Sequence, residues 1–244
     1  MTTDGDGWGG VGGLVLDAVG TLIEPSPSVA TAYTEAAGRQ GLVIDRGEVR
    51  RRFHQFFRVD EVDDQLGPLA TDEATERRRW RRIVGNVLPG LPDPDWAFAE
   101  LWDHFGRSSA WRTFPDVAPA LDELRRAGLP FVVASNFDGR LRGVVGGLPG
   151  LAGCQGRLVI SSEVGFRKPH PAFYRASCDR LALPPGNVLC VGDDPENDVL
   201  GPSRAGLRGV LIDRDHRDLT GLPSRADLAG LVREVLGAGV GRGR

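Results

Sequence analysis

The amino-acid sequence predicts an α/β fold, with a doubly wound parallel sheet as its core and an inserted all-helical domain. Five short apolar runs do not alternate with polar residues, which is typical of parallel strands buried on both faces. Helical patterns separate most of these runs, as expected where each strand is followed by a crossover helix. No convincing core strand lies between the first run and residue 115, which predicts the insertion.

The core is expected to comprise residues 11–24 and 112–238. Its strands are predicted at residues 13–18, 130–135, 157–161, 187–192 and 209–213. Three helices that start with proline, whose fixed φ suits a first helical turn, are predicted at residues 115–128, 171–183 and 195–206. In such sheets ligands bind beyond the carboxyl ends of the strands, so polar residues there are the candidate site.

The inserted domain is expected to span residues 25–111 and to act as a cap. Its helices are predicted at residues 28–40, 46–59, 71–87 and 95–108. The linkers at 24–28 and 110–115 are expected to be hinges that let the cap close over the core. The Gly-rich ends, residues 1–10 and 239–244, are expected to be flexible tails.

Composition excludes several classes of function. A net charge of -3 gives no support to nucleic acid as a partner. No apolar run approaches the roughly 18–20 residues that cross a bilayer, and the first residues lack the pattern of a signal peptide. The three cysteines, Cys154, Cys178 and Cys190, do not suggest a disulfide framework. We therefore expect a cytoplasmic protein without a membrane partner, and the sequence leaves its oligomeric state open.

Lys168 is the only lysine in the chain, so 29 of the 30 basic Lys and Arg residues are arginine. A compact ammonium on a flexible stem differs from the planar guanidinium of arginine, which argues for a specific role at this position. Lys168 stands in the segment GFRKPHP, before a predicted helix.

Four polar signals fall at or just after predicted strand ends. These signals are Asp17 with its Gly-Thr turn, Ser135 with Asn136, Lys168, and the acidic cluster of Asp193, Asp194 and Asp198. If they meet, close carboxylates repel one another by a few kcal/mol per pair at an effective dielectric of about 20. Lys168 and a Mg²⁺ ion, which prefers oxygen ligands, would offset that charge. Such a site suits a phosphoryl group, with Asp17 as nucleophile and Ser135 as hydrogen-bond donor.

Together the four segments resemble the sequence motifs of the haloacid dehalogenase superfamily, in members with a helical cap after the first strand. The matching segments are DAVGTL, SNFD, GFRKPHPAFY and VGDDPENDV, and the resemblance spans roughly residues 13–215. It implies a Rossmann-like core, an aspartyl nucleophile at Asp17, and Ser135 and Lys168 as catalytic residues that hold the transferred phosphoryl group.

The same resemblance implies the remaining site residues. Mg²⁺ would be bound by Asp17, by the main-chain carbonyl of Val19 and by Asp193, with Asp198 acting through a metal-bound water. Thr21 would support the nucleophile loop and, with Asn136, lie at the phosphate of the substrate.

Val19 departs from the pattern of phosphatases in this family, which place an aspartate two residues after the nucleophile. That aspartate protonates the leaving group and then activates water, and valine does neither. General acid–base help typically contributes about 10²–10⁴ in rate. His54, His104 and Glu24 are candidates to help the water instead.

Three interpretations follow, and we favour the first: a Mg²⁺-dependent hydrolase acting on a small phosphorylated metabolite through an aspartyl-phosphate. A good leaving group, such as that of an acyl phosphate, would need no acid. The second is a 2-haloacid dehalogenase that uses the same aspartate, although the acidic cluster argues for a metal. The third is a binding protein on the same scaffold with little or no turnover.

Overall fold

A six-stranded parallel sheet forms the centre of the computed structural model, which describes residues 8–66, 69–216 and 221–240. The strand order is β5-β4-β1-β6-β7-β8. In chain order the strands are β1 (Gly13–Leu16), β4 (Phe131–Ser135), β5 (Leu158–Ile160), β6 (Val188–Gly192), β7 (Arg208–Ile212) and β8 (Ser224–Arg225). The five predicted strands are confirmed. The two-residue β8 is too short to give a pattern in the sequence.

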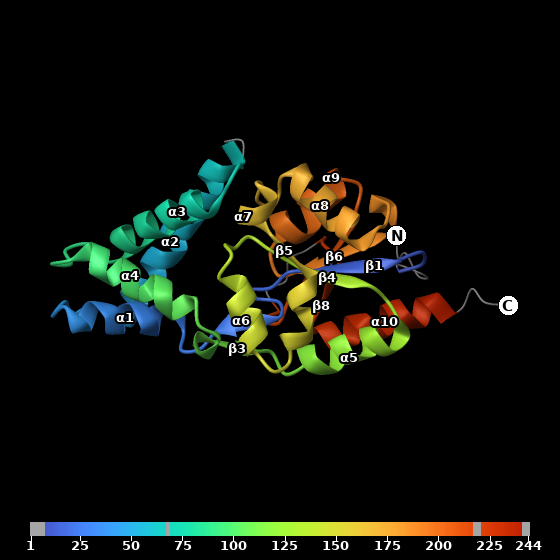
Figure 1. The fold of residues 1–244 in the computed structure, drawn as a ribbon, viewed down its shortest axis with the longest axis horizontal. Coiled ribbons are helices and arrows are strands. Elements are labelled where there is room, and N and C mark those ends of the chain that lie inside the picture. The colour runs from blue at the N-terminus through green and yellow to red at the C-terminus, as the bar shows by residue number, and fades with distance from the viewer. Residues whose placement is uncertain (1–7, 67–68, 217–220, 241–244) are drawn as a thin grey trace.

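Helices cover both faces of the sheet, as expected for a doubly wound fold (Figure 1). Leu14 and Leu16 of β1 belong to the apolar cluster beneath α5 (Val117–Ala127) and α10 (Leu228–Val240). Val15 points to the other face and packs in the cluster of α8 (Pro171–Leu181). Both faces of β1 are therefore buried, which is why its sequence lacks polar alternation.

Shorter helical segments complete the core. They are α6 (Leu141–Gly147), α7 (Ser161–Val164), α9 (Gly201–Arg204) and the turns η1 (Ser108–Ala110), η2 (Ala152–Arg157), η3 (Pro185–Asn187) and η4 (Glu196–Leu200). The helix predicted over 195–206 is instead divided into η4, which is a π-helical turn, and α9. Pro202 has no N–H to donate to the carbonyl four residues earlier, which interrupts regular α-helical bonding there.

The cap consists of the four predicted helices, α1 (Val29–Arg39), α2 (Arg46–Leu66), α3 (Glu73–Val87) and α4 (Pro94–Phe105). They lie together to one side of the sheet and have an apolar core of their own (Figure 1). Ser28, Asp72 and Asp93 each accept a hydrogen bond from a backbone N–H of the first turn of α1, α3 and α4. Helix α2 continues beyond the predicted end at residue 59.

Both linkers to the cap form one antiparallel ribbon, β2 (Ile23–Pro25) with β3 (Trp111–Thr113). The ribbon is reinforced by a hydrogen bond from Ser26 N to Ala110 O at 2.8 Å and by an ion pair between Arg112 and Glu24. The expected domain boundaries at residues 25 and 111 fall within this ribbon. The segments expected to be hinges are thus paired with each other, and hinge motion there stays a prediction.

The expected tails differ from the structure at their inner ends. Residues 8–10 form a turn in which Trp8 donates a hydrogen bond from Nε1 to Glu234 at 3.0 Å. Residues 239–240 belong to the last turn of α10 rather than to a tail. The rest of both tails lies outside the described residues. Within the described part of the chain, every helix is too short or too polar to cross a bilayer.

Leu121→Ala in α5 is expected to lower the free energy of unfolding by about 2–5 kcal/mol, because Leu121 is fully buried between α5 and the sheet and its truncation leaves a cavity. Urea unfolding followed by circular dichroism measures the change. Arg126→Ala on the exposed face of the same helix is the control and should change it by no more than about 0.5 kcal/mol. A loss below about 1 kcal/mol in Leu121→Ala would contradict the packing described.

Candidate active site

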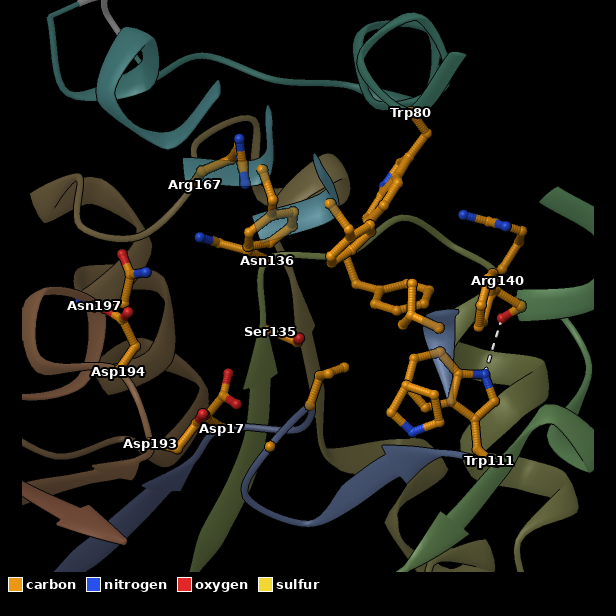
Figure 2. Close-up of a pocket in the computed structure, with 18 of the residues that line it drawn as sticks. Asp17, Trp80, Trp111, Ser135, Asn136, Arg140, Arg167, Asp193, Asp194 and Asn197 are labelled. Carbon is orange, nitrogen blue, oxygen red and sulfur yellow. Dashed lines mark hydrogen bonds between the residues drawn. The ribbon is translucent and has the colours of Figure 1, made fainter. Parts of the chain in front are cut away.

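Three neighbouring strands deliver polar residues to one edge of the sheet. Asp17 follows β1, Ser135 ends β4 and Asp193 follows β6, and β1 lies between β4 and β6. Parallel strands end at the same edge, so these residues converge although they are far apart in sequence. Figure 2 shows the carboxylates of Asp17 and Asp193 and the hydroxyl of Ser135 around one space.

Lys168 joins this group from the loop before α8. Its Nζ donates hydrogen bonds to Asp17 Oδ1 at 2.7 Å and to Asp198 Oδ1 at 2.8 Å, and the side chain is buried. Burial alone would lower the pKa of Lys168, but the two adjacent carboxylates outweigh burial and raise the pKa well above its ordinary value. The only lysine of the chain is therefore held as a cation between two predicted site carboxylates.

Glycines make room for the acidic cluster. Gly20 has φ +91°, which is the left-handed region, and a Cβ there would collide with the carboxylate of Asp193. A Cβ at Gly192 would collide with the carboxylate of Asp198. The turn after β1 and the end of β6 can therefore approach the acidic groups only because they lack side chains.

The acidic cluster holds more negative charge than Lys168 neutralises. Asp17, Asp193 and Asp198 each place a carboxylate oxygen within 4.8 Å of those of the other two. Burial, together with the neighbouring acids, raises the pKa of Asp17 to about 7 and that of Asp193 to about 8. Burial also raises the pKa of Asp194. Protons bind readily here because the ionised groups lack a sufficient counter-charge.

The donor set fits a hard divalent cation. Closely spaced, partly buried carboxylate oxygens are the ligands that Mg²⁺ takes, with water completing its shell. Asp198 is held in place because its Oδ2 accepts a hydrogen bond from Asp194 N at 3.1 Å. The buried acidic triad is therefore a possible metal site of the type that the motifs indicate.

Thr21 and Asn136, predicted at the phosphate of a substrate, have hydrogen bonds to other site residues. Thr21 is fully buried, is not part of the cavity wall, and donates from Oγ1 to Asp193 Oδ1 at 3.4 Å. The Asn136 amide donates to Lys168 O at 3.0 Å and accepts from Lys168 N at 2.7 Å. Both side chains thus support the residues that carry charge, and Asn136 fixes the backbone of Lys168.

A cavity of about 430 Å³ extends from this charged edge to the cap. Its cap wall is built mostly of aromatic side chains, namely Tyr33, Phe53, Phe57, Trp80, Phe98, Trp102 and Phe105. Figure 2 shows Trp80 on the cap side, and it shows Trp111, the first residue of β3, across the cavity from the acidic residues. The i, i+4 spacing of Phe53 and Phe57 in α2 was the available signal, but it does not say whether a stripe faces a core or a cavity.

Val19 is one of the residues that line the cavity. It also packs against the apolar core beneath the sheet. Of the three residues suggested to help water attack, His54 lines the cavity from the cap, whereas Glu24 and His104 are not part of the cavity wall. Arg167 and Arg140, which the sequence did not single out, also line the cavity.

Comparisons with known proteins agree with this architecture. A family model described as haloacid dehalogenase-like hydrolase matches residues 11–206. The haloacid dehalogenase-like hydrolase domain-containing protein 3 of Mus musculus is 28% identical over 82% of this chain and 80% of its own. A phosphoserine phosphatase of Thermus thermophilus is 33% identical over 84% of this chain and 89% of its own. The L-2-haloacid dehalogenase of Xanthobacter autotrophicus shares the fold, with TM-score 0.70, 20% identity and coverage of 93% and 99%.

The metal-free protein is expected to lose thermal stability as pH rises from about 4 to about 8. Folded Asp17 and Asp193 keep their protons up to pKa values of about 7 and about 8, whereas unfolded carboxyls release theirs near 3.8. The folded state therefore binds more protons in this window, and raising pH favours unfolding. Melting temperatures in EDTA at about pH 5 and about pH 8 measure the effect.

Saturating Mg²⁺ should restore the stability lost at about pH 8, since a cation that binds the ionised carboxylates stabilises the folded state. Asp193→Asn removes one of the shifted groups, so its melting temperature in EDTA should vary less with pH. A wild-type melting temperature that stays constant or rises over this range in EDTA would refute the electrostatic description.

Proposed function

The chain belongs to the haloacid dehalogenase-like hydrolases, and we propose that it transfers a phosphoryl group from a small phosphorylated metabolite to water through an aspartyl-phosphate on Asp17, with Mg²⁺ as cofactor. The observation that carries the proposal is the charged cluster of Asp17, Lys168, Asp193 and Asp198 at one end of the cavity. The similarity to a phosphoserine phosphatase supports phosphoryl chemistry.

Asp17 acts as the nucleophile. A carboxylate oxygen of Asp17 forms a bond to phosphorus while the bond from phosphorus to the leaving-group oxygen breaks, and that oxygen departs with the electron pair. Ser135 and Lys168 line the cavity beside Asp17 and supply a hydroxyl and an ammonium to the phosphoryl oxygens. Water then attacks the phosphorus of the aspartyl-phosphate, which releases phosphate and restores the Asp17 carboxylate.

Two carboxylates of the acidic triad and one main-chain oxygen would be the metal ligands. Asp17, Asp193 and the carbonyl of Val19 would hold Mg²⁺, and Asp198 would act through water. When bound, the ion supplies positive charge that offsets the carboxylates and the phosphoryl oxygens. Thr21 orients Asp193 through its hydrogen bond, and Asn136 keeps the Lys168 loop against β4.

Dehalogenation is the second candidate, because Val19 and the apolar cavity wall would also admit a haloacid. The three close carboxylates favour a metal-dependent phosphoryl reaction instead, since a neutral carbon centre has no use for a divalent cation. Chloride release from 2-chloropropionate that does not need Mg²⁺ would decide for the dehalogenase. If the protein turns over neither phosphate substrates nor haloacids, the third interpretation, a binding protein on the same scaffold, would be favoured.

Asp17→Asn is expected to lower Mg²⁺-dependent phosphate release by at least about 10³-fold, because the amide is not a competent nucleophile. The assay measures phosphate release from acetyl phosphate and a panel of phosphate esters, with and without EDTA. Asp122→Asn, an exposed aspartate on α5, is the matched control and should retain wild-type rates. Equal phosphate release by Asp17→Asn and wild type would rule out this mechanism.

A further inference from the structure

The part of the cavity beyond the charged cluster is apolar and aromatic. Phe53, Phe57 and Trp80 form one continuous wall, with ring centroids 5.5 Å apart for Phe53 and Phe57 and 6.0 Å apart for Phe57 and Trp80. The wall continues through Phe105 and Trp111, 5.9 Å apart, to Phe137 of the core. Aromatic walls bind flat apolar groups through offset or edge-to-face contacts.

Both arginines in the cavity wall already have carboxylate partners. Arg140 binds Asp138 in a bidentate pair, with Nε to Oδ1 and Nη2 to Oδ2 both 2.7 Å, and its guanidinium stacks 3.3 Å from the ring centroid of Trp102. Arg167 lies 3.5 Å from Glu76, which is buried in the cap. Each of the two cations therefore has a carboxylate counter-charge within the protein, which weakens its attraction for a second anionic group on a substrate.

Val19 lines the cavity two residues after Asp17, and its apolar side chain has no proton to give to a leaving group. An alcohol with a pKa near that of water, about 15.7, leaves slowly without a proton donor. A phenol, with a pKa of about 10 like that of tyrosine, leaves as the phenolate far more readily. The residue beside the nucleophile and the wall of the cavity thus favour the same kind of leaving group.

We propose that the substrate is a phosphate monoester of a phenol-type aromatic hydroxyl, carrying its charge at the phosphoryl end and a planar apolar body against the cap. This inference rests on the proposed phosphoryl transfer and names its substrate class. The cavity of about 430 Å³ lies within the range of about 300–1,000 Å³ that is usual for small-molecule sites.

The proposal fixes the order of the chemical steps. Asp17 takes the phosphoryl group, the bond from phosphorus to the aryl oxygen breaks, and the phenolate leaves and takes a proton from water. Hydrolysis of the aspartyl-phosphate then proceeds without an aspartate at position 19 to deprotonate the water, so this second step is the slow one. An initial burst of phenol, about equal in amount to the enzyme, should therefore precede steady turnover.

The experiment compares three probes with the full-length, Mg²⁺-loaded enzyme. Phenyl phosphate has an aromatic body and a phenol leaving group, benzyl phosphate has an aromatic body and an alcohol leaving group, and acetyl phosphate has a good leaving group without a ring. We expect kcat/KM for phenyl phosphate to exceed that for benzyl phosphate by at least about 100-fold, the range that a general acid contributes. Val19→Asp should narrow this ratio at least about tenfold and abolish the burst.

Recognition of the ring is tested separately with Trp80→Leu. The ratio of kcat/KM for 2-naphthyl phosphate to that for acetyl phosphate should fall about threefold to tenfold, the contribution expected of an aromatic contact. Trp96→Leu changes an exposed tryptophan of α4 and should leave the ratio unchanged. Wild-type protein should also bind 2-naphthylmethylphosphonate more tightly than methylphosphonate in calorimetry, a comparison that requires no turnover.

The outcomes separate this inference from the proposed function. Asp17-dependent hydrolysis of acetyl phosphate, with equal rates on phenyl and benzyl phosphate or without preference for the naphthyl probes, would overturn the inference and leave the phosphatase intact. If the protein hydrolyses none of the phosphate probes, both the inference and the proposed function are overturned. The expected burst, the leaving-group preference and the loss of selectivity in Trp80→Leu would together establish an aryl phosphatase.

Discussion

The ion-pair network around Lys168 is the interaction on which the site depends. Its Nζ lies 2.7 Å from Asp17 and 2.8 Å from Asp198, which are far apart in the sequence and come from different elements. Removing one partner of such a buried pair leaves an uncompensated charge, which is strongly destabilising. The network also explains the surrounding sequence, because the glycines at 20 and 192 are the residues that let the acidic side chains approach.

The cavity unites two parts of the chain that do separate tasks. The sheet edge supplies charge, and its geometry is fixed by strand order and by the hydrogen bonds of Asn136 to the Lys168 backbone. The cap supplies apolar surface from helices with a core of their own. The two linkers are paired in the β2–β3 ribbon. The cap is therefore attached to the core through a hydrogen-bonded β-ribbon and not through two unpaired linkers.

The core strands could be predicted because each is marked by a short, contiguous run of apolar residues in the sequence. The run LVLDAVGT shows both a buried strand and the aspartate at its end, and the five core strands appear where such runs occur. The hydrogen bonds that Thr21 and Asn136 make could not be predicted from the sequence, since hydrogen-bond partners depend on which strands are neighbours. Their place at the phosphate of a substrate stays a prediction. The aromatic cap wall of the cavity was not predicted for the same reason. Phe53 and Phe57 have the spacing of ordinary helix packing, and only the placement of the cap brings them into the cavity that also contains Asp17.

Val19 affects both the charge of the site and the shape of its cavity. An aspartate at this position would add another carboxylate beside Asp17, where burial and neighbouring acids already raise pKa values. Valine leaves the cluster with fewer charges to neutralise and adds an apolar side chain to the cavity wall near Asp17. In the proposed phosphoryl transfer valine also offers no proton to the leaving group, so the rate would depend on how well that group carries negative charge. The residue at position 19 would then affect the electrostatics, the shape and the substrate range of the site together.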